Sequence, residues 1–161
     1  MSLQGRSLFG TTWILAIMLA GTLSQAQRPD LPPGTIDGAT TPQLIPDSTA
    51  FRLVFLSLRV PGSPSANDLK NQSSRLKHIG LSDEDAAAAK GIMSSFGTSY
   101  DAWQTKFGQP GSSIDVPTAK SEREAIVQET LGRVMKGLSP EGAAKLAEYV
   151  QAAKSRMVVH E

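Results

Sequence analysis

Residues 82–108 read SDEDAAAAKGIMSSFGTSYDAWQTKFG and carry the strongest structural signal in the chain. Their apolar side chains recur at steps of three and four positions, which is the spacing of one α-helical face. The members of this stripe are Ala89, Ile92, Phe96, Tyr100, Trp103 and Phe107. Ser82 can cap the helix, and acidic residues 83–85 occupy the first turn, where the helix dipole favours negative charge. The stretch predicts a long helix with one buried face.

Similar patterns lie on both sides of this helix. One helix is expected from about residue 65 to 79, with Gly80 as its C-terminal cap. Two more are expected at about 117–136 and from Ser139 onward, where Pro140 takes the first helical position. Amphipathic helices joined by short loops bury their apolar stripes against one another. The sequence therefore predicts an all-α fold, a small bundle of four to five helices.

Residues 51–60, FRLVFLSLRV, suit either a strand or a helix by composition. Three consecutive apolar residues break the alternation of a half-buried strand, whereas Ala50, Val54 and Leu58 fall at helical spacing. Asp47 can begin such a helix. We expect a buried helix here, with a strand over the same residues as the open alternative.

The first 26 residues have the three-part layout of a secretory signal. Arg6 supplies the positive charge, residues 8–23 form the apolar stretch, and Ser24-Gln25-Ala26 places small residues at the cleavage site. We expect cleavage after Ala26 and a periplasmic or secreted location in a bacterium. An uncleaved anchor is the alternative, but a spanning helix needs roughly 20 apolar residues. No later segment is apolar enough to span a membrane.

Proline and glycine dominate residues 27–46, which we expect to form an extended lead-in with turns. One turn is expected at Ile36-Asp37-Gly38, where Gly38 is free to take a positive φ. The predicted organisation is thus a signal peptide at 1–26, the lead-in at 27–46 and a helical domain at 47–161.

The composition excludes several classes of function. Lys and Arg number 16 against 15 Asp and Glu, so the chain lacks the positive field typical of nucleic-acid or anionic-membrane binding. Cysteine is absent, which excludes disulfides, a thiolate nucleophile and a cysteine-ligated metal. We expect no nucleic-acid partner.

No catalytic, metal or cofactor site is predicted. His78 and His160 lie far apart in sequence, and no metal-binding spacing includes either of them. Asp83, Glu84 and Asp85 could bind a cation, but their place in a first helical turn is explained by the helix dipole. Other acidic residues can pair with bases four positions away: Lys120 with Glu124, Glu129 with Arg133, and Glu141 with Lys145.

Tyr100 and Trp103 are the candidate ligand-binding residues, because each carries a polar group on an aromatic ring that needs a partner. The alternative is that their stripe is ordinary core. We expect a non-enzymatic binding or envelope-stress protein with an apolar groove between helices for an unknown protein or apolar ligand. The competing hypothesis is a hydrolase that uses Glu122 and Glu129, which are seven residues apart on one helical face. Convergence of two carboxylates with His78 in a closed cavity would favour this hypothesis.

Short motifs in this chain resemble those of a group of small exported helical bacterial proteins. Near the start these are Ile36-Asp37-Gly38, Pro42, Leu44-Ile45-Pro46-Asp47 and Ala50-Phe51-Arg52-Leu53, and near the end Leu138-Ser139-Pro140-Glu141-Gly142 and residues 154–157. The group is uncharacterised, so the resemblance implies export but no activity.

Overall fold

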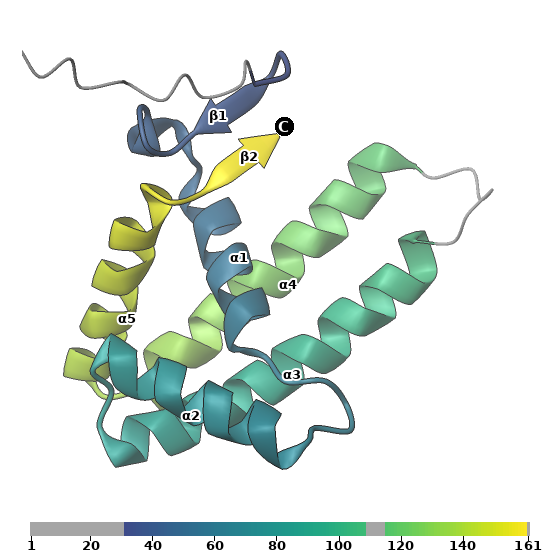
Figure 1. Ribbon diagram of the computed structural model, residues 1–161. Coiled ribbons are helices and arrows are strands. Elements are labelled where there is room, and N and C mark those ends of the chain that lie inside the picture. Colours follow the sequence, from purple (N-terminus) through teal and green to yellow (C-terminus); the bar gives the residue numbers. More distant parts are fainter. Residues whose placement is uncertain (1–30, 109–114, 161) are drawn as a thin grey trace, which may run out of the picture. The chain divides into compact units, whose positions relative to one another are not determined.

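The structure is a computed structural model that describes residues 31–108 and 115–160. The predicted signal at 1–26 and its cleavage site lie outside the described residues. The described elements are five α-helices, one short 3-10 helix and one two-stranded sheet (Figure 1). In chain order they are β1 (Thr35–Asp37), the 3-10 helix η1 (Pro42–Leu44), α1 (Asp47–Leu58), α2 (Ala66–Ile79), α3 (Asp83–Phe107), α4 (Val116–Gly137), α5 (Pro140–Lys154) and β2 (Val158–His160). The predicted all-α bundle is confirmed.

Helix α1 lies at the centre of the bundle and contacts all the other helices, while α3 and α4 lie side by side (Figure 1). The segment that suited either a strand or a helix, residues 51–60, is helical as far as Leu58. Helical spacing brings Ala50, Val54 and Leu58 onto one face beside Phe55, and all four side chains are almost fully buried. The Phe55 ring meets the edge of Phe96 from α3, with centroids 5.5 Å apart. The helix expected from Asp47 is confirmed, and it ends at Leu58.

The predicted helix ends are set by local hydrogen bonds. Ser82 Oγ accepts from the Asp85 N–H at 3.1 Å, and Ser139 Oγ accepts from the Gly142 N–H at 3.0 Å. Gly80 ends α2 in the left-handed conformation, with a φ of 88°. Two ends differ from expectation. Helix α4, expected to end at about residue 136, includes Gly137 as its last residue, and α5, for which no end was predicted, stops at Lys154.

The small sheet is not foreseen by the sequence. β1 and β2 pair antiparallel, with Ile36 opposite Val159. The turn expected at Ile36-Asp37-Gly38 is wrong, because Ile36 and Asp37 belong to β1 and the turn follows them. Gly38 does not have a positive φ; it lies against the end of α5 and donates its N–H to the Met157 carbonyl at 2.8 Å. Strands of three residues are too short to show an alternating pattern.

Within the ranges 31–108 and 115–160, no helix combines the length and the apolar character needed to cross a membrane.

Candidate functional site

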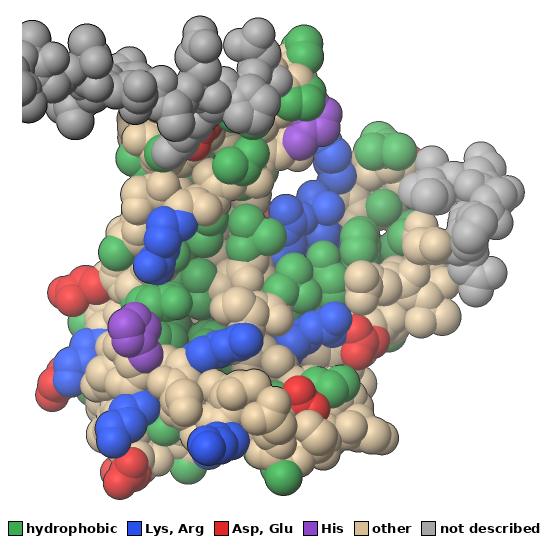
Figure 2. Space-filling model, viewed as in Figure 1, with side chains coloured by type: hydrophobic (Ala, Val, Ile, Leu, Met, Phe, Trp, Pro, Cys, Tyr) green, Lys and Arg blue, Asp and Glu red, His purple; other side chains and the backbone are tan. Residues whose placement is uncertain are grey.

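A hollow of about 490 Å³ lies between α1, α4 and the C-terminal strand β2. Figure 2 shows Lys and Arg side chains gathered around it, below the strand. Its lining residues are Thr49 and Arg52 from α1, Lys120, Ser121, Arg123 and Glu124 from α4, and Val159 and His160 from β2. Val159 is the only apolar side chain among these eight, so the hollow is polar and mainly cationic.

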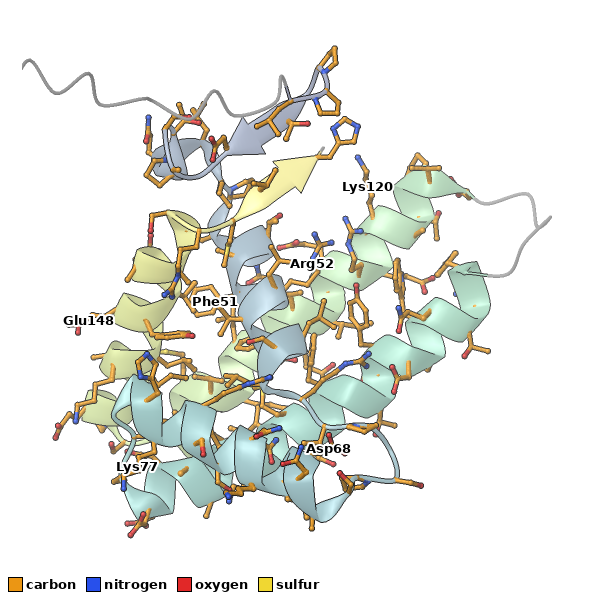
Figure 3. The ribbon with its side chains drawn as sticks, in the orientation of Figure 1. Phe51, Arg52, Asp68, Lys77, Lys120 and Glu148 are labelled. Carbon is orange, nitrogen blue, oxygen red and sulfur yellow. The ribbon has the colours of Figure 1, made fainter. Side chains whose placement is uncertain are left out.

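Arg52 forms the α1 side of the hollow. It interrupts an otherwise apolar run of the helix and faces α4 (Figure 3). Among the described residues, its buried Nε has no hydrogen-bond partner, and no carboxylate forms an ion pair with it. Burial lowers the pKa of the Arg52 guanidinium, and the positive charge of Arg123 lowers it further. Tyr100 and Glu124 act in the opposite direction without reversing the shift. The described residues thus do not fully compensate the positive charge of Arg52.

Helix α4 supplies the second side through consecutive positions of its early turns. Arg123 lies over the Trp103 ring, with its Cζ 5.7 Å from the ring centroid. Glu124 accepts a hydrogen bond from the Gln128 side chain at 2.8 Å. The ion pair expected between Lys120 and Glu124 is not among those found in the described residues, although both side chains line the hollow. Lys120 lies opposite Arg52 across the hollow (Figure 3).

The C-terminal strand closes the third side. Val159 is 7% exposed and forms part of the core, while its neighbour His160 is exposed at the hollow. The sheet fixes this position because β1 pairs with β2, and Thr35 Oγ1 lies 3.5 Å from His160 Nδ1. His160 thereby joins the cationic side chains of α1 and α4.

The predicted ligand residues Tyr100 and Trp103 are not among the side chains that line the hollow, but lie next to those that do. Tyr100 is 7% exposed, and its ring centroid is 5.3 Å from that of Trp103. Trp103 Nε1 donates to the Ala119 carbonyl at 2.9 Å, so this polar group is satisfied by the protein. Each ring lies beneath a guanidinium group, that of Arg59 over Tyr100 and that of Arg123 over Trp103, and of these two arginines Arg123 lines the hollow. Ligand binding by Tyr100 and Trp103 stays a prediction.

The residues of the hydrolase hypothesis are engaged elsewhere. Both carboxylate oxygens of Glu122 accept from Lys106, at 2.7 and 2.9 Å, and Glu129 accepts from Arg133 at 2.7 Å. His78 lies edge-on to Tyr149, 6.2 Å between ring centroids. No hydrogen bond in the described structure joins His78 to Glu122 or Glu129. The structure therefore does not assemble them into one site.

The acidic turn 83–85 has a structural explanation. Asp85 is 6% exposed, and its carboxylate accepts from the Ser139 N–H and hydroxyl, each at 2.7 Å, and from the Ser82 hydroxyl at 3.0 Å. Its oxygens are thus occupied by protein donors. Over the described ranges, no group of three or more His, Cys, Asp or Glu side chains is placed to hold a metal ion.

A second, shallower hollow lies between α3 and α4 and has a volume of about 380 Å³. Ala88, Gly91 and Ile92 line it from α3, and Arg133 and Lys136 line it from α4. This is the nearest feature to the apolar groove expected from the sequence, but Tyr100 and Trp103 are not among its lining residues.

Arg52, Arg123 and His160 were not predicted as site residues, and Lys120 was expected only in a helix pair. One signal was available: Arg52 is a lone charge inside the apolar run AFRLVFL. A charge within a buried helix needs a partner, and the local sequence provides none for it.

Comparison with known proteins gives no match: no family model, no curated protein and no solved structure matches this chain.

Proposed function

We propose that this is an exported, non-enzymatic binding protein whose ligand is an anion held in the hollow between α1, α4 and β2. The observation that carries the proposal is Arg52, whose buried Nε has no hydrogen-bond partner among the described residues and whose guanidinium group lies near the like charge of Arg123. Partial burial of a guanidinium group beside a like charge disfavours its charged form. An anion between the two guanidinium groups would offset this effect and the repulsion between them.

The lining favours an anion over the apolar ligand or unknown protein expected from the sequence. Among the described residues that line the hollow, Arg52, Lys120 and Arg123 are the cationic side chains and Glu124 is the only carboxylate. Guanidinium groups are matched to carboxylate and phosphate oxygens by their fixed fork of N–H donors. These features support a recognition site for a small anionic molecule.

Binding without chemistry is favoured over hydrolysis for two reasons. Glu122 and Glu129, the carboxylates of the hydrolase hypothesis, are held in ion pairs with Lys106 and Arg133. A general base must lie within hydrogen-bond reach of the group it deprotonates, and neither carboxylate lines the cationic hollow. The hydrolase hypothesis therefore has no supporting geometry.

Export is supported by the sequence of residues 1–26, with Arg6, the apolar stretch and the small residues Ser24 and Ala26. The test is the intact mass of the protein recovered from the periplasm or medium of its source cell. We expect a mass that begins at Gln27. A mass that retains residues 1–26 contradicts cleavage, and retention in the membrane fraction supports the anchor instead.

Anion binding is tested by isothermal titration calorimetry with inorganic phosphate and succinate at low ionic strength. Lys120→Gln is compared with Lys70→Gln, which removes the same charge from an exposed position of α2. We expect measurable binding that Arg52→Gln and Lys120→Gln weaken by about tenfold and that Lys70→Gln leaves unchanged. Circular dichroism checks that Arg52→Gln is folded. Equal effects of the two lysine substitutions, or no binding of either anion, contradict the proposal.

A further inference from the structure

The charges of the described residues that line the hollow match those of a dianion. Arg52, Lys120 and Arg123 carry three positive charges at neutral pH, and Glu124 carries one negative charge. A ligand with two negative charges would neutralise this excess. A monocarboxylate or a sulfate ester would leave one positive charge uncompensated.

The donors approach the hollow from three elements and therefore from several directions. Thr49 lies one turn before Arg52 on α1, so both side chains share a face. Ser121 and Arg123 approach from α4, and His160 approaches from β2. Donors that come from three elements suit a tetrahedral group with three free oxygens better than a planar carboxylate with two. Guanidinium groups bind phosphate oxygens in bidentate fashion, and hydroxyl groups can donate to the remaining oxygens.

The size of the hollow leaves space beside a phosphate group. Its volume of about 490 Å³ falls in the range of pockets for small organic ligands, roughly 300–1,000 Å³. The buried side chain of Val159 gives it one apolar wall next to the cations. This wall suits the organic part of a ligand whose charged end lies between the two arginines.

We propose that the ligand is a small, soluble phosphate monoester, with its dianionic group bound by Arg52, Lys120 and Arg123 and its organic part against Val159. This inference rests on the proposed anion-binding function and adds the chemical class of the ligand. The hydroxyl groups of Thr49 and Ser121 donate further hydrogen bonds to the phosphate oxygens.

The experiment compares phenyl phosphate with phenyl sulfate by calorimetry at about pH 8. The two esters share size and tetrahedral shape, but at this pH the phosphate carries close to two negative charges and the sulfate one. We expect phenyl phosphate to bind about tenfold more tightly than phenyl sulfate and more tightly than inorganic phosphate. Lys120→Gln should remove most of the preference for the phosphate ester, whereas Lys70→Gln should preserve it.

Other results of these binding measurements would overturn separate parts of the proposal. Equal affinity for the two esters, or tighter binding of succinate, overturns the phosphate inference and leaves anion binding in place. If inorganic phosphate binds as tightly as phenyl phosphate, the proposed contact of the ligand's organic part with Val159 is overturned. Binding to vesicles that contain phosphatidic acid, without binding of glycerol 3-phosphate, overturns a soluble ligand. Failure of all these anions to bind overturns the proposed function itself.

Discussion

The carboxylate of Asp85, in the first turn of α3, accepts two hydrogen bonds from Ser139, the residue that caps α5. Ser139 uses its N–H and its hydroxyl as donors, both at 2.7 Å, and its Oγ also accepts from the Gly142 N–H. The hydroxyl of Ser82, the cap of α3, donates to the same carboxylate. One buried side chain therefore joins the N-terminal ends of two helices.

Loss of this junction is expected to destabilise the domain. Ser139→Ala removes the cap of α5 and should lower the free energy of unfolding by about 1 kcal/mol. Asp85→Ala should cost more, because it leaves the N–H and hydroxyl groups of Ser139 and the hydroxyl of Ser82 without their acceptor. Asp83→Ala is the control, since Asp83 is exposed in the same helical turn. Urea unfolding gives the comparison, and equal losses for Asp83→Ala and Asp85→Ala would contradict a specific role for Asp85.

Acid should weaken the fold through the same residue. The hydrogen bonds from the Ser139 N–H and hydroxyl hold the pKa of Asp85 below its ordinary value of 3.8. The pKa of Asp47 is lowered as well, first by the hydrogen bond from Lys154. A carboxyl group with a lower pKa in the folded state stabilises the fold above its unfolded-state pKa and loses this effect as the pH falls through the folded-state value.

Stability should therefore change little between about pH 7 and 5 and should decline below about pH 4. Urea unfolding midpoints of the parent protein and of Asp85→Asn, measured across this range, provide the test. The variant should be less stable at neutral pH and should lose less on acidification. Parallel pH profiles for the two proteins would show that Asp85 is not the group responsible.

The ion pair between Lys154 and Asp47 should contribute more than the surface ion pairs do. Lys154 Nζ lies 2.5 Å from Asp47 Oδ1, and the lysine side chain is only 8% exposed, whereas that of Asp47 is 66% exposed. Lys154→Met should cost about 1–2 kcal/mol, between the values typical of exposed and of buried pairs. The control Lys106→Met breaks the exposed pair with Glu122 and should cost less than about 1 kcal/mol. Thermal unfolding of both variants is the test. Similar losses of stability for Lys154→Met and Lys106→Met would contradict a larger contribution from the pair between Lys154 and Asp47.

A methyl group at Gly38 should disrupt the contact between the turn after β1 and the end of α5. A Cβ there would lie 1.8 Å from the Lys154 carbonyl oxygen, a backbone atom that cannot rotate away. Gly38→Ala should therefore destabilise the domain by about 2 kcal/mol or more. Gly132→Ala is the matched change, because Gly132 lies in α4 with nothing within 4 Å of its Cβ position. That substitution should stabilise by about 0.5–1 kcal/mol. Denaturant titration of both variants tests the opposite signs.

Helix positions were largely predictable because their determinants lie within a few residues of one another. Ser82, Ser139 and Pro140 mark helix starts at the predicted places, and Gly80 ends α2 as expected. The partners of Asp85 were not predictable. Its place in the first helical turn was explained by the helix dipole, but its carboxylate also accepts hydrogen bonds from Ser139, which is 54 positions away.

The sequence by itself determined the helices of this protein, since the 3.6-residue period, caps and dipole-matched charges act through neighbours along the chain. Only the tertiary structure decided the cationic hollow. Arg52, Arg123 and His160 come from α1, α4 and β2, and no spacing rule connects positions so far apart. Their meeting depends on how α1 packs against α4 and on the pairing of β1 with β2. Those contacts form only when the whole bundle buries its apolar faces together. For that reason no spacing in the sequence predicted that these residues would meet.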